Sequence, residues 1–233
     1  MTQQTFAMLQ QYMQACMDDS AHDALHIYRV LHNALQIAQA ESQVDYDVLI
    51  TACLLHDIGR REQFADPALC HAQVGSRKAY DFLREHDFPE EFCRRVEHCI
   101  LTHRFRKATP PQSLEAKILF DADKLDVTGA IGIARSLMYK ADVAEPLYCL
   151  RDDGSVDDGS EDTQPSFFRE YKFKLEKLYD RFYTARGAQL ARDRQKIAAD
   201  FYQALYREVG FGQEAGAQLL TKLLQEDGHE TEG

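Results

Sequence analysis

Apolar residues recur along this chain at steps of three and four positions, which is the spacing of one face of a helix. Residues 23–40 show the pattern most clearly, with a wide apolar face made of Ile27, Val30, Leu31, Ala34, Ile37 and Ala38. No segment alternates apolar and polar residues in the way that a half-buried strand does. The pattern therefore predicts an all-α protein.

Prolines, glycines and polar runs divide this pattern into separate helices. Pro89 stops one helix, and Pro110-Pro111 marks a hard break. Helices are predicted at residues 5–17, 23–40, 45–57, 71–86, 90–103, 113–125, 168–182 and 190–205. Asp45 is the expected N-cap of the third helix. Gly129 and Gly132 predict a close packing contact or a kink just after the helix at 113–125.

Residues 151–165 break the pattern, because they are rich in aspartate and contain little that can pack. We expect a mobile acidic loop there, either a lid or a simple insertion. The whole chain then divides into one helical domain at 1–210, with further helices at 165–210, followed by a C-terminal helix and polar tail at 211–233. The tail, from Gln225 on, is expected to be disordered.

The composition narrows the class of protein. Of the 233 residues, 45% are hydrophobic, which is enough for a real core. The formal net charge of −11 argues against a nucleic-acid polymer as partner, because phosphate contacts need a basic surface. We find no N-terminal signal and no apolar stretch near the ~20 residues of a membrane span, so no membrane partner is expected. The six cysteines form no Cys-x-x-Cys pair, which fits reduced thiols in a cytoplasmic protein.

Candidate chemistry begins where the most apolar run of the chain ends. Residues 48–55 are apolar apart from Thr51, and His56 and Asp57 follow directly. A helix of this composition is buried on most faces, so it delivers an imidazole and a carboxylate into the interior. A buried carboxylate without a partner costs several kcal/mol, and a cation that His56 also binds would remove that cost. Gly59 then lets the chain leave the helix.

Other residues with metal-ligand chemistry lie on separate predicted helices. They are His26, His98, His103, Asp121 and Asp123. Helical bundles build metal sites from the side chains of facing helices, so these residues can converge with His56 and Asp57. Imidazole and carboxylate donors without sulfur suit Mn²⁺, Fe²⁺, Co²⁺, Ni²⁺ or Mg²⁺ rather than structural zinc.

The order of these residues resembles the HD superfamily of metal-dependent phosphohydrolases. The resemblance covers residues 20–140 and rests on His26, on Leu-Leu-His-Asp-Ile-Gly at 54–59 and on Asp-Ala-Asp-Lys-Leu-Asp at 121–126. Gly-Ala-Ile-Gly-Ile-Ala-Arg at 129–135 and Thr-Ala-Arg-Gly at 184–187 look most like small bacterial members, and relatives of that kind include enzymes that cleave nucleotides. The resemblance implies an HD-domain helical bundle, with its core at 20–140 and with additional C-terminal helices.

The resemblance also implies the ligands of one divalent ion. They are His26, His56, Asp57 and Asp123. Asp123 is preferred to Asp121 because it resembles the aspartate of an Ala-Asp-Lys/Arg-Leu string in the family. Residues two positions apart on a helix point in different directions, so both cannot face one ion. His71 resembles the extra histidine that some HD proteins use for a second metal, and His98 and His103 could complete that second site.

Two further groups of residues are candidates for catalysis and for substrate binding. Asp57, His98 and Asp121 are the candidate catalytic residues, with His98 suited to a role as general acid or substrate contact. The candidate substrate-binding residues are Arg60, His71, His103, Lys124 and Arg186. For His71 and His103 a surface role is an equal alternative.

Together these residues predict a metal-dependent phosphohydrolase that acts on a small phosphorylated molecule, in first place a nucleotide. A nucleoside triphosphate pyrophosphohydrolase and a nucleotidase both fit, and the sequence leaves the native metal and the oligomeric state open. A di-iron oxygenase of the HD type is one alternative, and it needs a second ion at His71 with His98 or His103. The other alternative is a non-catalytic sensor domain that binds a nucleotide, and the intact set of four expected ligands counts against it.

Overall fold

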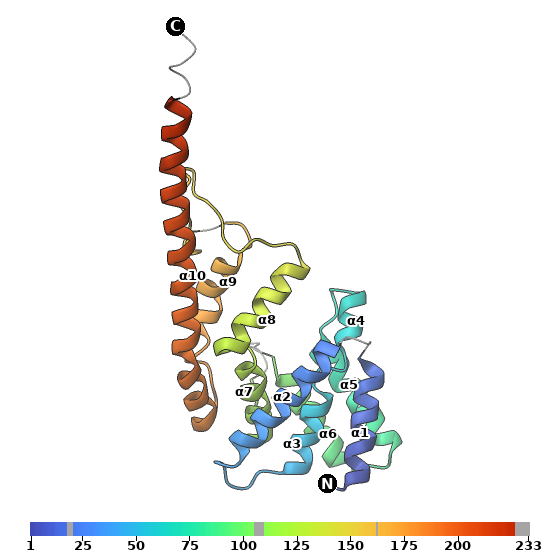
Figure 1. Ribbon diagram of the computed structural model, residues 1–233. Coiled ribbons are helices and arrows are strands. Elements are labelled where there is room, and N and C mark those ends of the chain that lie inside the picture. The colour runs from blue at the N-terminus through green and yellow to red at the C-terminus, as the bar shows by residue number, and fades with distance from the viewer. Residues whose placement is uncertain (18–20, 105–109, 162, 227–233) are drawn as a thin grey trace. The chain divides into compact units, whose positions relative to one another are not determined.

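The structure, a computed structural model, describes residues 1–17, 21–104, 110–161 and 163–226 (Figure 1). The helices are α1 (Gln3–Cys16), α2 (Ala21–Ala38), α3 (Tyr46–Leu55), α4 (Arg60–Ala65), α5 (His71–Glu85), α6 (Glu90–Thr102), α7 (Leu114–Leu125), α8 (Gly129–Asp142), α9 (Phe167–Phe173), the 3-10 turn η1 (Leu175–Lys177) and α10 (Ala185–Glu226). These described residues contain no strand, only an isolated antiparallel bridge between Leu150 and Val156. The predicted all-α class is therefore confirmed.

The chain forms two compact units. The first contains Met1–Asp126 and Asp180–Ala191, and the second contains Val127–Tyr179 and Arg192–Gly233. Helix α10 begins in the first unit and continues in the second, so the predicted boundary at residue 210 falls inside a continuous helix. Glycines such as Gly210 cost a helix only about 1 kcal/mol each, which α10 tolerates.

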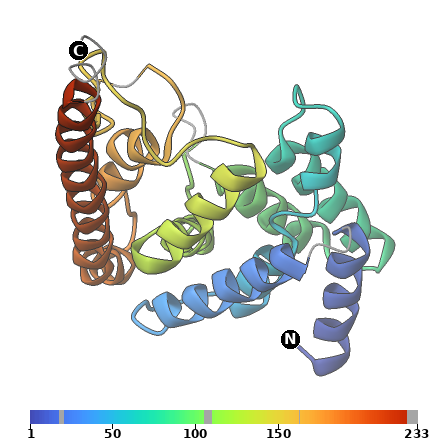
Figure 2. The ribbon, with the colours of Figure 1, turned by 45° about the horizontal axis from the view of Figure 1, so that its top comes forward.

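The first unit is organised around α3. Helices α2, α6, α7 and α1 all pack against it, and α2 also lies beside α7 (Figures 1 and 2). Seven of its ten residues are buried, because the apolar run leaves almost no polar face. The Asp45 side chain accepts hydrogen bonds from the backbone of Asp47 and Val48, as predicted for the N-cap. The packing of α3 therefore delivers its last turn, with His56 and Asp57, into the interior.

Gly59 is required here for a different reason from the one expected. Its φ is −96°, so it does not end the helix in the left-handed conformation. A Cβ atom at this position would lie 2.4 Å from His71 O and 2.5 Å from Gly75 N. The first turn of α5 therefore packs directly against the backbone that follows Asp57, and this close approach places His71 beside Asp57.

The second unit contains the C-terminal helices and the acidic segment. Gly129 and Gly132 make the predicted close contacts, since a Cβ would lie 2.8 Å from Arg194 Cβ in one case and 2.3 Å from Val127 O in the other. The helix predicted at 168–182 is wrong in extent. Helix α9 ends at Phe173 and continues only as the 3-10 turn η1, because Lys174 leaves the helical region at φ −126° and ψ −62°.

The acidic segment is more ordered than expected over residues 150–161. Asp157 is buried, accepts a hydrogen bond from Gly159 N (2.6 Å) and pairs with Arg151 (3.1 Å). Tyr202 of α10 also donates a hydrogen bond to Asp158 O. The prediction of a loop without packing is therefore wrong for this stretch. The polar tail predicted to be disordered lies outside the described residues from 227 on.

Two further expectations concern thiols and membranes. All six cysteines are free, and four of them are buried, as the absence of paired spacing predicted. None of the described helices combines the length and the hydropathy that crossing a bilayer requires.

The contact at Gly59 predicts a large cost for a single methyl group. We expect Gly59→Ala to lower the free energy of unfolding by about 1–3 kcal/mol, because the new Cβ meets backbone that cannot move aside. Gly210→Ala is the matched control, since nothing lies within 4 Å of its Cβ. It should stabilise α10 by about 1 kcal/mol. Urea denaturation measures both values, and equal effects of the two substitutions would contradict this account.

Candidate metal centre

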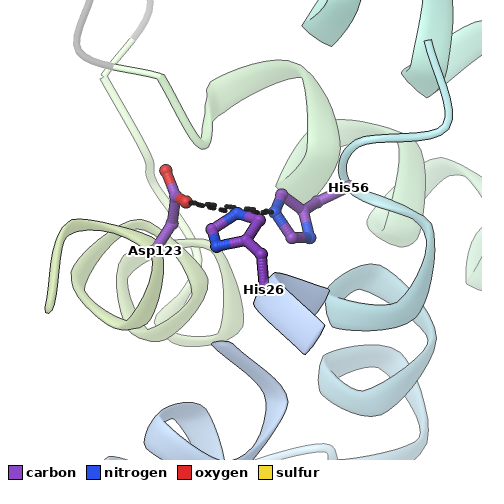
Figure 3. A group of neighbouring side chains, drawn as sticks. All are labelled: His26, His56 and Asp123. Carbon is purple, nitrogen blue, oxygen red and sulfur yellow. Dashed lines mark hydrogen bonds and ion pairs between the residues drawn. The ribbon is translucent and has the colours of Figure 1, made fainter. Parts of the chain in front are cut away.

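Three side chains from three different segments come together in the first unit (Figure 3). His26 lies on α2, His56 follows the last residue of α3, and Asp123 lies on α7. The His26 Nε2 atom is 3.4 Å from His56 Nε2 and 3.3 Å from Asp123 Oδ1, and His56 Nε2 is 3.9 Å from Asp123 Oδ1. Both histidines are buried, whereas the Asp123 side chain is 28% exposed, so the group meets solvent at this carboxylate.

Asp57, the fourth expected ligand, lies between this group and two more histidines. Its Oδ2 atom is 3.4 Å from His26 Nε2 and 3.5 Å from His56 Nε2. Its Oδ1 atom is 3.4 Å from His71 Nε2 and 3.7 Å from His103 Nε2. The ligand atoms of Asp57, His71 and His103 form a second group of metal-ligand type, all within 4.8 Å of one another. Both added histidines are buried, which excludes the surface role considered for them.

All four histidines use the Nδ1 atom for a hydrogen bond to an oxygen acceptor. The bonds run from His26 to Asp126 Oδ2 (2.7 Å), from His56 to Cys53 O (2.7 Å), from His71 to Gln63 Oε1 (2.5 Å) and from His103 to Ile100 O (2.6 Å). A neutral imidazole with its proton on Nδ1 presents a bare lone pair at Nε2. The Nε2 atoms of all four histidines therefore face the oxygens of two carboxylates, an arrangement that a cation between them would stabilise.

Two of these atoms have no hydrogen-bond partner among the residues that the structure describes. Asp57 Oδ1 and His71 Nε2 are buried and unpaired, 3.4 Å from each other. Leaving a buried polar atom unsatisfied costs about 1–3 kcal/mol, and more when the group is charged. A cation would satisfy both atoms at once. The donor set and its unpaired atoms therefore fit a divalent metal ion.

Burial and hydrogen bonding set the protonation of these groups. Burial lowers the pKa of His56 to about 4 and that of His71 to about 3, so both are neutral near pH 7 and suited to bind metal. Burial would raise the pKa of Asp57, but Arg60 and the nearby histidines hold it well below its usual range. His26 differs, because hydrogen bonds to three aspartates outweigh the effect of burial and raise its pKa to about 10. A metal ion at His26 Nε2 has to displace that proton.

The three predicted substrate cations lie in different surroundings. Arg60 donates from Nε to Asp57 Oδ2 at 2.5 Å and is 34% exposed, so it lies at the centre. Lys124 is buried over the Phe120 ring and donates to the backbone oxygen of Arg181 at 3.2 Å. Burial lowers its pKa to about 8. Arg186 donates to Gln189 on the surface of α10. The structure therefore brings Arg60, of these three, into contact with the expected ligands.

Asp121 and His98 are in neither group of ligand atoms. Asp121 accepts hydrogen bonds from Tyr183 N, Thr184 N and Thr184 Oγ1 at 2.7–3.1 Å, which fixes the start of α10. It lies two positions from Asp123, about 200° around α7. His98 lies five positions before His103, about 140° around α6. Its buried Nε2 atom has no hydrogen-bond partner in the described ranges. These contacts lend no support to the catalytic roles predicted for Asp121 and His98.

Sequence reasoning missed three residues that support the centre. Asp126 accepts from His26, Arg29 pairs with Asp126, and Gln63 accepts from His71. The role of Asp126 could have been predicted from its spacing, because it lies three positions after Asp123 on the same face of α7. Arg29 is likewise three positions after His26 on α2. Gln63 had no such signal, since it lies on the short helix α4 within a polar segment.

Comparison with known proteins assigns the chain to a family. The HD domain family model matches residues 24–128. The uncharacterized protein YpgQ of Bacillus subtilis (strain 168) is 30% identical over 197 residues, which cover 82% of this chain and 86% of YpgQ. This chain therefore belongs to the HD domain family, and the resemblance read from its sequence is confirmed.

Solved structures agree with this assignment. The crystal structure of Bacillus subtilis YpgQ matches with a TM-score of 0.68 and 27% identity, covering 88% of this chain and 96% of that one. A crystal structure of an HD-superfamily hydrolase from Bacillus thuringiensis matches with a TM-score of 0.67 and 28% identity, covering 88% and 97%. A further crystal structure of YpgQ, in complex with ADP, matches with a TM-score of 0.67.

Asp121 and Asp123 provide a matched pair of substitutions. We expect Asp123→Ala to lose bound metal with little change in thermal stability, because its carboxylate faces the two histidines. Asp121→Ala should keep the metal content and lower the free energy of unfolding by about 1–3 kcal/mol, because buried donors at the start of α10 lose their acceptor. Elemental analysis and thermal denaturation measure the two effects. Loss of metal in Asp121→Ala at unchanged stability would reverse the assignment.

Proposed function

We propose that this protein is a metal-dependent phosphohydrolase that acts on a small phosphorylated molecule, a nucleoside triphosphate in first place. One observation carries the proposal: four buried imidazoles present Nε2 atoms to two carboxylates. Asp57 Oδ1 and His71 Nε2 find no hydrogen-bond partner among the described residues, and a divalent ion between them would satisfy both atoms.

The proposed ligands of the ion are His26, His56, Asp57 and Asp123. Nitrogen and oxygen donors of this kind suit Mn²⁺, Fe²⁺, Co²⁺, Ni²⁺ or Mg²⁺. Such an ion supplies a water of lowered pKa and a Lewis acid for a phosphoryl oxygen. Asp123 marks the open side of the group, since the other three side chains are almost fully buried. A substrate would approach from that side.

The surrounding residues orient the ligands and meet the substrate's charge. The Nδ1 hydrogen bonds fix each imidazole ring, so that Nε2 stays directed at the centre. Arg60 holds Asp57 ionised and is one-third exposed, so its guanidinium can also contact a phosphate. His71 and His103 are further candidates for substrate contact beside Asp57.

The choice of a nucleotide rests on the relatives and on local charge. A crystal structure of YpgQ, 27% identical to this chain, is in complex with ADP. The net charge of −11 does not oppose an anionic substrate, because salt limits long-range repulsion to ~8 Å. The charge close to the centre decides, and there Arg60 and a bound ion are positive.

A substrate panel tests the proposal. Ribo- and deoxyribonucleoside mono-, di- and triphosphates are incubated with the protein and Mn²⁺, and the products are separated by chromatography. We expect turnover of triphosphates to a diphosphate or monophosphate. Turnover confined to monophosphates would indicate a nucleotidase. Binding without turnover of any nucleotide would indicate a sensor domain and contradict the proposal.

Ligand substitutions test the centre itself. We expect His56→Ala or Asp57→Ala to abolish tight metal binding and hydrolysis while leaving the helical content largely intact, because each removes a donor from the group. His32→Ala is a matched control, since His32 is an exposed histidine on α2. Metal content and circular dichroism are the measurements. Full metal stoichiometry in either ligand variant would show that the assignment is wrong.

The second group of donors favours one alternative, a di-iron oxygenase. Asp57 contacts both groups, so two ions could share its carboxylate. If the protein is an oxygenase, we expect two irons in each chain and uptake of oxygen. The variant His71→Ala should then bind one iron. The phosphohydrolase predicts release of phosphate or pyrophosphate whether one ion binds or two. Iron analysis with an oxygen electrode separates the two functions.

A further inference from the structure

Asp126 lies directly behind His26, on the side away from the expected metal ligands. We propose that Asp126 is a positioning residue, which fixes His26 for metal binding and is itself held in place by Arg29. The inference rests on the proposed metal-dependent function and adds two residues to it. Its basis is three hydrogen bonds: His26 Nδ1 to Asp126 Oδ2 at 2.7 Å, Arg29 Nε to Oδ1 at 2.7 Å and Arg29 Nη2 to Oδ2 at 2.9 Å.

The bond from His26 to Asp126 determines which nitrogen faces the centre. Because Nδ1 donates to the carboxylate, Nε2 is the atom directed at Asp57 and Asp123, at 3.4 and 3.3 Å. The acceptors of the other three imidazoles are uncharged oxygens. A carboxylate acceptor makes an imidazole a stronger electron donor and locks its tautomer and ring orientation. His26 is therefore the ligand whose affinity for metal depends most on a second residue.

Arg29 supplies the counter-charge for the buried carboxylate of Asp126. The Asp126 side chain is 1% exposed, and a buried carboxylate needs a paired cation. Arg29 supplies it with two parallel N–H···O bonds, the geometry that binds a carboxylate most firmly. Arg29 is 35% exposed, so its own charge is only partly removed from water.

Because of their spacing, the contacts of Asp126 and Arg29 depend on how α2 packs against α7. His26 and Arg29 are three positions apart on α2, and Asp123 and Asp126 are three positions apart at the end of α7. Each pair therefore lies on one helix face. The last turn of α7 therefore supplies Asp123, a proposed metal ligand, and Asp126, the carboxylate that holds His26. Any slip of α2 along α7 would break both sets of contacts together.

A buried ion pair could also serve stability alone, so the test needs a matched control. Asp45 forms an ion pair with Arg95, at 2.7 Å, that lies away from both groups of ligand atoms and is more exposed, at 36% for Asp45 against 1% for Asp126. Full-length wild type, Asp126→Ala, Asp126→Asn and Asp45→Asn are titrated with Zn²⁺ against a chelator. Thermal denaturation records the loss of stability for each variant. NMR of ¹⁵N-histidine-labelled protein with Zn²⁺ reports which nitrogen of His26 carries the proton.

We expect Asp126→Ala to weaken Zn²⁺ binding about 10- to 100-fold and to lose the single Nδ1–H tautomer of His26. Asp126→Asn, which keeps an acceptor oxygen without the charge, should fall between wild type and Asp126→Ala. Asp45→Asn should lose stability and keep wild-type Zn²⁺ affinity. Unchanged affinity and tautomer in both Asp126 variants would overturn the positioning role and leave the phosphohydrolase proposal standing. A wild type that binds no ion would overturn both.

Discussion

The buried carboxylate of Asp57 is the constraint on which the rest of this structure depends. It follows the most apolar helix of the chain, and both of its oxygens lie among imidazole nitrogens. Such a group is stable only where positive charge balances it. Arg60 supplies part of that charge through Oδ2, and within the described part of the chain Oδ1 has no hydrogen-bond partner. The fold therefore positions a carboxylate that a metal ion would complete.

Ordinary helix packing brings the proposed metal ligands together. The mostly apolar surface of α3 buries this helix, and Gly59 lets α5 approach the residues that follow it. His26 on α2 and Asp123 on α7 then face His56, which comes directly after α3. The imidazole rings are then oriented by acceptors close to them in sequence, except for His26. His26 takes its acceptor from α7, a hundred residues away. That bond makes the site depend on the packing of α2 against α7.

The net charge of the chain does not conflict with the anionic substrate proposed for the centre. The charge of −11 is spread over the chain, whereas the substrate would meet a bound ion and Arg60 beside it. Because solvent and salt screen distant charges, these nearby groups dominate binding. Asp57 contacts two groups of donors, so the same framework has room for one ion or two. The number of ions alone therefore does not separate the proposed hydrolase from an oxygenase, whereas oxygen uptake and phosphate release do.

Most helices and the residue types of the expected ligands could be predicted from the sequence, because both are local signals, whereas α4, α8 and the end of α9 could not. Apolar periodicity showed the α-helical class, and polar residues at the ends of apolar runs showed His56 and Asp57. The sequence favoured Asp123 over Asp121 by resemblance alone, and the packed helices give the physical reason: Asp123 faces the histidines, while Asp121 holds the start of α10. Only the tertiary structure decided that His71 joins Asp57 and that Asp126 supports His26. These contacts join residues far apart in the chain, so they depend on how helices pack, and no local pattern encodes that.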